Sequence, residues 1–523
     1  MKPIEAADKV TVIFGAGNTA RQIAEEAAAV GRQAILVTED RMEAVSDAET
    51  IRSAASISLL TESRLKRCSG SIGDFTVELQ KNGETRVIEA AGLVVAEPGL
   101  RRANFASYDL TPGDAVISLS DLKTWLEDPA GMTRGGSSFK HLVLLHGIAT
   151  ESVPAVAEEV MSAAIRLQQE FGVQTYVLTG NLKVAGNGLE ALYRKSKEAG
   201  VFYVKFTDTA PVIRQENDGS VILEFVDEFT WQRFSLRPDL TVVDENLEPS
   251  EMLSSLARML DLELDVRGFA QADNVHRWTV ETNRRGIFSA GTARAVLAEE
   301  ERRLDASNAA ARIARGRGAL EEDRARIDQG LCIRCLTCFR LCPHRAIRIT
   351  EAERVEVMAE ACERCGICAA ECPRTAITIP GLTRDELLRE ASAPSTAPVR
   401  ITAFCCSRSA APAGDTARRM AGSLPEGLTI VEVPCAGTIS LSQLMHAFAR
   451  GADGVVVLSC HPDNCHSRKG NMLARQRVEL LKDRLSGLGF DPQRLFYGTL
   501  ASNMGVEFAE AVEAFEKMLV DLA

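Results

Sequence analysis

The sequence predicts an α/β protein built from several units, and three observations support this. At 523 residues the chain is longer than one hydrophobic core can organise, which predicts three or four domains. Strand and helix patterns alternate through the amino-terminal region and return near the carboxyl end. Of the 14 cysteines, only Cys68 precedes residue 332. The predicted units are residues 1–315 with a second nucleotide-fold unit at about 116–240, residues 316–381, a linker at 382–399, and residues 400–523.

Charge and hydropathy exclude several classes of partner. The formal net charge is −12, and acidic and basic residues are interspersed without a basic block. This argues against nucleic acid or an anionic membrane as a partner. The first apolar run is soon broken by Gly15, and no later stretch approaches a membrane-spanning length. We expect a cytoplasmic protein without direct membrane insertion.

The first element is a strand, glycine turn, helix and strand in "KVTVIFGAGNTARQIAEEAAAVGRQAILVTED", residues 9–40. The turn reads G-x-G-x-x-A, and an acid closes the second strand, where it can accept a hydrogen bond from a ribose hydroxyl. The helix N-terminus would face a pyrophosphate. This predicts a dinucleotide site, with an ordinary βαβ turn as the alternative. Its residues are Gly15, Gly17, Asn18, Ala20 and Glu39.

A second strand, helix and strand pattern begins at residue 141, "HLVLLHGIATESVPAVAEEV" and onward. It predicts a second nucleotide-fold unit. Because only Gly147 stands where a glycine-rich phosphate turn would be, we expect no nicotinamide nucleotide there.

The segment "RRGIFSAGTARA", from residue 284, looks like the strand and turn with which two-dinucleotide flavoproteins return to their flavin. An acid usually follows that glycine, whereas here Thr292 follows Gly291. An "ATG"-like turn is likewise replaced by "VVAEPG" at 94–99. Because of the likeness to that segment, we expect a two-dinucleotide-binding flavoprotein-like region that binds FAD rather than NAD, with Gly291 and Thr292 in contact with it. Because of the two departures, a degenerate empty fold is the alternative.

The cysteine-rich segment carries C-x2-C-x2-C-x3-C-P twice, at 332–343 and 362–373. This spacing is typical of bacterial two-cluster ferredoxins, in which the fourth cysteine of each run ligates the other cluster. Two structural zinc sites are the alternative, although zinc rarely uses three cysteines at successive two-residue gaps. The segment thus predicts an α+β ferredoxin domain with two [4Fe–4S] clusters. One would be held by Cys332, Cys335, Cys338 and Cys372, and the other by Cys362, Cys365, Cys368 and Cys342.

The last segment predicts a small parallel α/β domain, with strands at "RITAF", "LTIVEV", "DGVVVL" and "RLFYG". Its cysteines follow three of these strands, so they should converge outside the carboxyl edge of the sheet, near the surface. We expect a [2Fe–2S] cluster there, with structural zinc as the alternative. The candidate ligands are Cys406, Cys435, Cys460 and Cys465, with Cys405 spare or substituting.

These motifs resemble two known families. The ferredoxin runs, "GIFSAGTA" and "GNGLEALYRKSKEAGVFYVKF" resemble the A subunit of heterodisulfide reductase, a flavin-bearing hub of electron-bifurcating complexes. "FCC", "GADGVVVLSCHPDNCH" and "ARQRVELLK" resemble the delta subunit of methyl-viologen-reducing hydrogenase, a [2Fe–2S] protein. A fusion of the two is similar to the B subunit of quinone-interacting membrane-bound oxidoreductase. Departures are Ser409, where the delta family commonly has a third cysteine, and the scarcity of cysteines in the flavin half.

The resemblance implies an electron-transfer subunit that relays electrons between partner subunits through a [2Fe–2S] cluster, two [4Fe–4S] clusters and FAD, with flavin-based bifurcation as one use of such a hub. The implied partners are heterodisulfide reductase B- or C-like, hydrogenase, formate dehydrogenase or quinone-reducing subunits. It would be an oxidoreductase subunit, not catalytically complete alone. The alternatives are a self-contained flavin-dependent reductase and a zinc-stabilised assembly scaffold.

Overall fold

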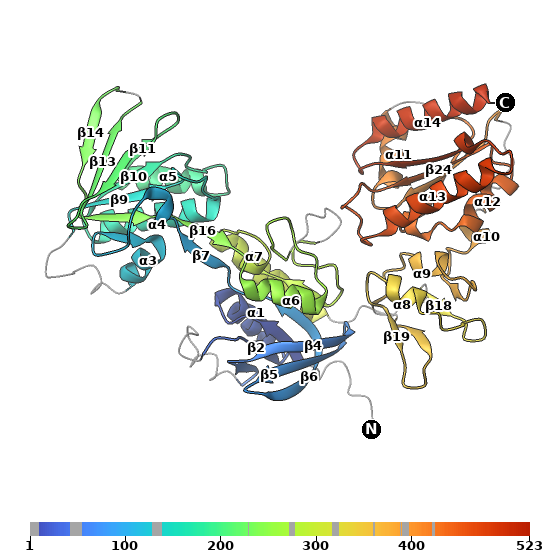
Figure 1. Ribbon diagram of the computed structural model, residues 1–523, viewed down its shortest axis with the longest axis horizontal. Helices are drawn as coiled ribbons and strands as arrows, with labels where there is room; N and C mark the ends of the chain where they lie inside the picture. Colours follow the sequence, from blue (N-terminus) through green and yellow to red (C-terminus); the bar gives the residue numbers. More distant parts are fainter. Residues whose placement is uncertain are drawn as a thin grey trace.

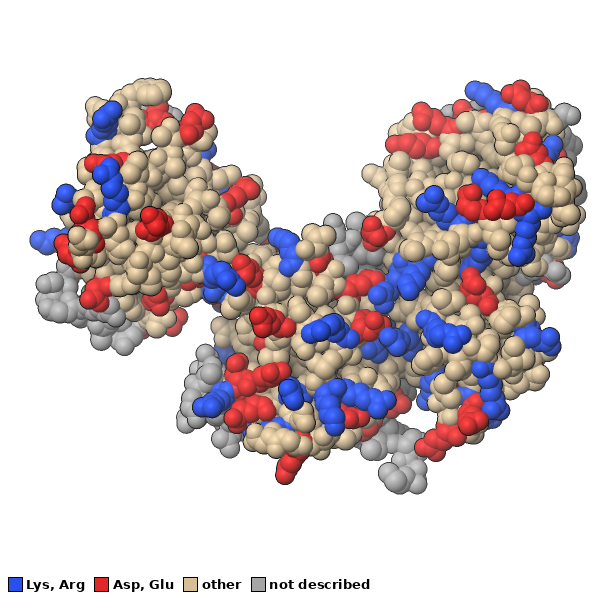
Figure 2. All heavy atoms as spheres, viewed as in Figure 1, with Lys and Arg blue, Asp and Glu red and all other residues tan. Residues whose placement is uncertain are grey.

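The computed structural model describes residues 10–41, 55–127, 139–228, 230–270, 278–315, 324–358, 361–387, 389, 397–420 and 424–522. The predicted unit boundary at 315/316 falls at the edge of the described residues. Most of the Ser- and Pro-rich part of the predicted linker lies outside them. The second nucleotide-fold unit and the carboxy-terminal domain lie at opposite ends of the long axis, with the amino-terminal unit between them (Figure 1). Lys and Arg alternate with Asp and Glu over the visible face (Figure 2). No described helix is both long and apolar enough to cross a membrane.

The amino-terminal unit is a seven-stranded sheet in the order β3-β2-β1-β6-β5-β4, with β17 paired to β6. β1, β2, β3, β6 and β17 run parallel, and alternate residues of β1 enter two cores, Val12 on one face and Ile13 on the other. Helices α1 and α7 pack together on the Ile13 face. The bounds are β1 Val10–Phe14, α1 Asn18–Ala29, β2 Ala34–Val37, β3 Ile57–Leu60, β4 Arg64–Ser71, β5 Asp74–Lys81, β6 Glu84–Val95, α6 Glu251–Leu260, β17 Ile287–Ser289 and α7 Glu299–Arg315.

The second unit is a five-stranded parallel sheet in the order β11-β10-β9-β15-β8, with a three-stranded antiparallel sheet, β12-β13-β14, inserted before β15. An antiparallel pair, β7 and β16, joins it to the first unit. The bounds are β7 Leu100–Ala103, β8 Val116–Ser118, α3 Leu119–Glu127, β9 His141–His146, α4 Pro154–Glu170, β10 Gln174–Thr179, α5 Leu189–Glu198, β11 Phe202–Lys205, β12 Val212–Gln215, β13 Val221–Val226, β14 Arg233–Leu236, β15 Leu240–Val243 and β16 Glu245–Glu248.

The cysteine-rich unit, called the ferredoxin unit below, contains two small antiparallel strand pairs beside two short helices. The pairs are β18 with β21 and β19 with β20. Its apolar core takes in Ile72 from the first unit, and Arg285 there pairs with Glu363 at 3.5 Å. Ile72 abuts Gly286, which precedes β17, so this unit docks at the amino end of the parallel strands. The bounds are β18 Arg326–Ile327, α8 Thr337–Leu341, β19 Ile347–Ile349, β20 Val355–Val357, α9 Ile367–Ala370 and β21 Ile377–Thr378.

The carboxy-terminal domain is a parallel four-stranded sheet in the order β23-β22-β24-β25, covered on both faces by helices. All four predicted strands are confirmed. Helix α12 begins with a capping box, in which the side chains of Ser440 and Gln443 each accept a hydrogen bond from the other residue's backbone amide. The bounds are α10 Arg384–Leu387, β22 Ile401–Cys406, α11 Ala410–Met420, β23 Leu428–Val433, α12 Leu441–Ala449, β24 Gly454–Ser459, α13 Gly470–Ser486, β25 Leu495–Thr499 and α14 Gly505–Asp521.

Candidate metal centres and dinucleotide site

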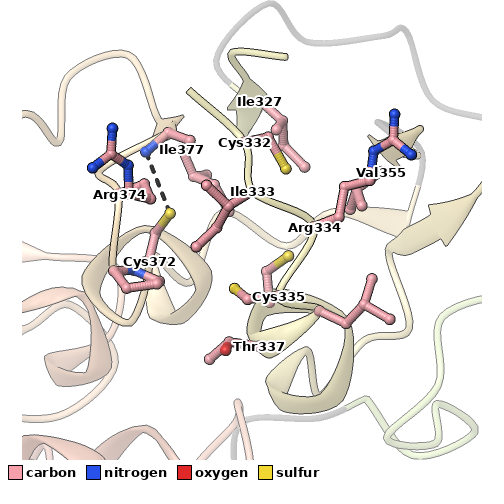
Figure 3. Close-up of a pocket in the computed structure, with 14 residues that line it drawn as sticks. Ile327, Cys332, Ile333, Arg334, Cys335, Thr337, Val355, Cys372, Arg374 and Ile377 are labelled. Carbon is pink, nitrogen blue, oxygen red and sulfur yellow. Dashed lines mark hydrogen bonds between the residues drawn. The ribbon is translucent and has the colours of Figure 1, made fainter. Parts of the chain in front are cut away.

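The first candidate centre, called the outer site, is a hollow of about 370 Å³, open solvent included. Figure 3 shows cysteine side chains around it, with Cys372 reaching in from the second cysteine run. Ile327, Ile377 and Val355 supply apolar walls. In two-cluster ferredoxins the fourth cysteine of each run ligates the other cluster, and the structure brings together the four cysteines that this pattern assigns to one cluster. They are Cys332, Cys335, Cys338 and Cys372.

The inner site is a matching hollow of about 360 Å³. Four cysteines again line it, three from the second run and one from the first, which are Cys362, Cys365, Cys368 and Cys342. His344 and Ile367 also line it. Each hollow is thus a space lined by four cysteines, which is the ligand number that a cubane cluster requires.

The two halves repeat each other in backbone detail. Residues thirty positions apart adopt the left-handed conformation in pairs, namely Arg334 and Arg364, Leu336 and Gly366, and Arg345 and Thr375. The amide of Ala346 donates to Cys342 Sγ at 3.3 Å, and that of Ala376 donates to Cys372 Sγ at 3.3 Å. Such N–H···S bonds stabilise thiolates and tune a bound cluster.

Burial separates the two sites. Cys335 of the outer site is exposed, and a hydrogen bond from Thr337 lowers its pKa. The inner-site Cys362, Cys365 and Cys368 are buried, and burial raises the pKa of Cys365 to about 12. Ligation by a cation offsets that desolvation cost, so the inner thiolates depend more on the charge of a bound group.

The third candidate centre, called the tail site, lies at the carboxyl edge of the last sheet. Its sulfurs contact one another in a chain, with hydrogen bonds linking Cys406 to Cys460, Cys460 to Cys465, and Cys465 to Cys435. The hydrogen bond donated by Cys460 lowers the pKa of the Cys406 thiol. A Cβ at Gly470 would lie 2.2 Å from Cys435 Sγ, so the sulfurs occupy space that only a glycine leaves.

Cys405 is not part of this group. It packs in the apolar core on the opposite face of β22, with Phe508 and Ala413, because neighbouring strand residues point to opposite faces. Ser409, in the position of the family's third cysteine, has its hydroxyl beside Cys406, where it lowers the thiol pKa after the larger effect of Cys460. His461 is engaged with Thr499, Nδ1 to Oγ1 at 3.0 Å.

The tail site is covered by the inner site. Cys435, Cys460 and Cys465 are 4%, 4% and 3% exposed and share an apolar cluster with Cys365 and Ile367. Arg477 of α13 holds Glu371 of the ferredoxin unit at 2.6 Å and donates to the carbonyls of Gly437 and Ile439. The prediction that the tail site lies near the surface is therefore wrong, because the ferredoxin unit occupies the open edge of the sheet.

The glycine cradle, which is the turn at Gly15 and Gly17 before α1, is where the sequence predicts a dinucleotide site. A Cβ at Gly15 would meet Ala96 O at 2.4 Å, so the turn approaches β6 as only glycine permits. Gly17 and Asn18 border a hollow of about 1510 Å³, open solvent included, and Ala20 is buried in the core. Glu39 borders a separate hollow of about 1080 Å³, open solvent included.

The opposite wall of the cradle departs from this pattern. Gly291 abuts Thr19, and the Thr292 hydroxyl accepts from the amide of Gly99 at 2.9 Å, so it serves the loop at 97–99. Glu97 is buried there, and burial, with Asp40 and Glu39 nearby, raises its pKa to about 7. Roughly 15 Å of strand separates Gly291 from Gly286, where the ferredoxin unit docks.

Comparisons with known proteins assign the carboxy-terminal part. The model of the 4Fe-4S dicluster domain matches residues 324–373, and that of the methyl-viologen-reducing hydrogenase delta subunit matches residues 401–523. The D iron-sulfur subunit of the F420-non-reducing hydrogenase of Archaeoglobus profundus is 34% identical over 116 residues, which are 22% of this chain and 85% of that protein. Through its last domain, the chain belongs to the hydrogenase delta-subunit family.

The part before the delta-subunit domain is similar to the A subunit of heterodisulfide reductase. The A subunit of the Ferredoxin/F(420)H(2)-dependent CoB-CoM heterodisulfide reductase of Methanosarcina acetivorans is 30% identical over 348 residues, 65% of this chain and 44% of that protein. The A subunit of the ferredoxin:CoB-CoM heterodisulfide reductase of Methanosarcina mazei is 28% identical, with the same coverage. The chain thus joins a part similar to these A subunits to a delta-subunit domain, and spans less than half the length of these relatives.

Among solved structures, T. acidophilum thioredoxin reductase aligns with 59% of this chain and 97% of its own, at 15% identity and a TM-score of 0.39. A score of this size does not establish a shared fold. The strand orders given above therefore carry the fold assignment of the amino-terminal half.

Sequence reasoning missed the residues that join the delta-subunit domain to the inner site. A Cβ at Gly366 would lie 1.4 Å from Thr438 Oγ1, and one at Gly437 would lie 2.7 Å from Ile367 Cγ1. The sequence held one signal for this contact. In the duplicated motif, glycine replaces Leu336 only in the second copy, at Gly366.

Proposed function

We propose that the chain is an electron-transfer subunit of a hetero-oligomeric redox complex, in which the tail site, the inner site and the outer site form one relay. The observation that carries the proposal is the shared apolar cluster of Cys365, Ile367 and the delta-subunit domain's cysteines. Two groups of thiols that share one apolar cluster suit electron exchange between them. This oxidoreductase role requires partner subunits, and their identity is part of the proposal.

The two ferredoxin hollows fit [4Fe–4S] clusters because each is lined by four cysteines and carries an N–H···S bond. When bound, such clusters supply one-electron steps. The chain's own residues hold the sulfurs at fixed positions and exclude water from the inner site. The outer set would be Cys332, Cys335, Cys338 and Cys372, and the inner set Cys342, Cys362, Cys365 and Cys368.

The tail site fits a [2Fe–2S] cluster better than a single zinc ion. Its four sulfurs make contacts in a chain, from Cys406 through Cys460 and Cys465 to Cys435. A tetrahedral zinc ion would instead place every sulfur about 2.3 Å from one point. Cys405 is left out of this ligand set because it faces the opposite core.

FAD is the dinucleotide that we propose for the cradle at Gly15 and Gly17. The free amides at the start of α1 would face the pyrophosphate, and Glu39 would accept from a ribose hydroxyl. Thr292 would fix the loop at 97–99 rather than contact the ligand, since its hydroxyl is held by Gly99. The ferredoxin unit docks at the amino end of the parallel strands, whereas the cradle lies at their carboxyl end. Electron transfer between flavin and clusters would therefore be slower than electron transfer between the inner and tail sites.

The outer site would be the relay's exit to a partner protein. Cys335 is exposed and Ile333 beside it is 60% exposed, whereas the inner and tail sites are covered. The proposed partner classes are heterodisulfide reductase B- or C-like, hydrogenase, formate dehydrogenase and quinone-reducing subunits. The names of the relatives support the heterodisulfide reductase and hydrogenase classes.

The test is the metal content of the anaerobically purified full chain. About ten irons and ten acid-labile sulfides per chain are expected, together with non-covalent FAD released by acid. A variant carrying Cys435→Ser and Cys460→Ser should lose about two irons and keep the flavin. Zinc in place of iron would overturn the relay in favour of a scaffold. Rapid reduction of the isolated chain by NADH would favour a self-contained reductase.

A further inference from the structure

In the second nucleotide-fold unit, the proposed relay does not use the carboxyl edge of the sheet, where an open parallel sheet forms its ligand crevice. β9 ends at His146 and β10 at Thr179, which lie opposite each other in the ladder. Leu142 and Leu144 pack in the core beneath α4, and strand alternation puts His146 on that same face. The imidazole therefore lies at the carboxyl edge of the sheet, under the beginning of α4.

Two buried polar side chains at this edge each have an atom without a hydrogen-bond partner among the described residues. His146 is 1% exposed, its Nδ1 lies 3.0 Å from Thr179 Oγ1, and its Nε2 has no hydrogen-bond partner among the described residues. Ser152 is 8% exposed, and its Oγ is likewise without a partner in the described part of the chain. A Cβ at Gly147 would lie 3.2 Å from Ser152 Cβ, so Ser152 adjoins the residue after His146. Buried polar atoms are rarely left unpaired, and two neighbouring ones indicate a polar ligand.

The surroundings favour an anion. Helix α4 has 17 residues and begins with Pro154. It has neither a side-chain cap nor an acid in its first turn, so no group within that turn offsets the positive end of its dipole. Lys183, on the loop after β10, adds a cation near His146, where it and the larger effect of burial lower the imidazole pKa to about 4. Glu151, largely exposed, is the residue that pairs with Lys183. Asp244, at the end of β15, is occupied by the amide of Gly147 at 2.6 Å.

The loops that border the crevice lie close together. A Cβ at Gly180 would lie 2.3 Å from Gly147 O, so the loops after β9 and β10 touch through their backbones. A dinucleotide needs an open glycine-rich turn at this place, which the sequence lacks.

From these contacts we propose that the crevice binds one small inorganic oxyanion of the phosphate or sulfate type. With the Thr179 hydroxyl donating to Nδ1, the neutral imidazole of His146 donates to the anion from Nε2. The Ser152 hydroxyl donates from the loop, and Lys183 leaves Glu151 to pair with the anion. This site is independent of the iron–sulfur and flavin proposals.

Calorimetric titration of the full chain with inorganic phosphate and, separately, sodium sulfate tests the site at constant ionic strength. One saturable site per chain is expected. Lys183→Gln should weaken it about tenfold and Ser152→Ala about threefold, since charge-assisted hydrogen bonds are the stronger kind. The matched control is Lys195→Gln, an exposed lysine of α5 in the same unit, which should bind as the wild type does.

A second readout follows the imidazole directly. In protein with ¹³C-labelled histidine, one of seven histidine signals should shift on titration, and His146→Gln identifies it by its absence. Acetate, a planar anion, is titrated as a third ligand. It should not compete with phosphate or sulfate, because the proposed site takes a tetrahedral anion. An unshifted His146 signal with every anion would mean that water fills the crevice, and equal binding by Lys183→Gln and Lys195→Gln would place the anion elsewhere. Either result overturns the proposal.

Discussion

The loops around the outer and inner sites have the same backbone course and different neighbours. At equivalent positions Leu336 has φ 58° and Gly366 has φ 77°, both left-handed. Because the outer loop accepts a leucine, conformation alone does not require glycine in the inner loop. The requirement comes from Thr438 of the delta-subunit domain, which occupies the space of a Cβ at Gly366. The second copy of the duplicated motif thus packs against the delta-subunit domain, whereas the first copy is open to solvent at Cys335.

The strongest test of this comparison exchanges the two residues. Gly366→Leu should cost at least about 3 kcal/mol of docking between the delta-subunit domain and the ferredoxin unit, because the new side chain overlaps Thr438. Leu336→Gly, the matched control, should change stability by less than about 1 kcal/mol. Limited proteolysis and thermal unfolding would measure both. Equal effects of the two substitutions would remove the proposed difference between the loops.

A second test concerns the ion pairs of each half. Arg477→Met should cost about 2–3 kcal/mol, because it leaves Glu371 and the Gly437 and Ile439 carbonyls without their donor. Arg334→Met, which breaks an exposed pair with Glu353, should cost less than about 0.5 kcal/mol. Denaturant unfolding followed by cluster absorbance gives both values. A large effect of Arg334→Met would mean that exposure does not distinguish the sites.

Solvent access should also separate them. With an Fe²⁺ chelator, the outer cluster of the reconstituted protein should bleach about tenfold faster than the inner one, since Cys335 is exposed and Cys365 is buried. Gly366→Leu should bring the two rates closer by opening the inner site. A single bleaching phase in the wild type, unchanged in the variant, would argue against the difference in burial.

The dinucleotide cradle gives a smaller, pH-dependent effect that the metal sites should lack. The Glu97 pKa is raised to about 7, so the carboxyl is neutral below that pH and adds a negative charge beside Glu39 and Asp40 above it. FAD affinity should therefore fall a few-fold as pH rises from 6 to 8. Glu97→Gln should abolish this fall, as fluorescence titration of released flavin would record. An unchanged pH profile in the variant would assign the titration to another group.

Sequence reasoning reached what local spacing dictates. The grouping of Cys372 with the first run follows from the geometry of two-cluster ferredoxins, and the structure lines one hollow with those four sulfurs. The strands of the delta-subunit domain were readable because each is a short apolar run between turn residues. Strand alternation also means that only one of Cys405 and Cys406 can face the tail site, although the sequence does not say which.

What the sequence left open depends on contacts between units. The cover over Cys435, Cys460 and Cys465 comes from residues more than sixty positions earlier in the chain, such as Ile367, and no local pattern records that docking. Thr292 is similar, because its hydroxyl is held by Gly99, a partner 193 positions distant. These long-range contacts decide which of the predicted sites are open to solvent.

The central claim is that the tail site and the inner site adjoin and exchange electrons directly. Electron paramagnetic resonance of the fully reduced chain tests it, because paramagnetic clusters at adjoining sites broaden or split each other's signals. We expect a [2Fe–2S] signal split by the inner cluster in the wild type and in Leu336→Gly, and an unsplit signal in Gly366→Leu. An unsplit [2Fe–2S] signal in the wild type, with all clusters present and reduced, would contradict the relay.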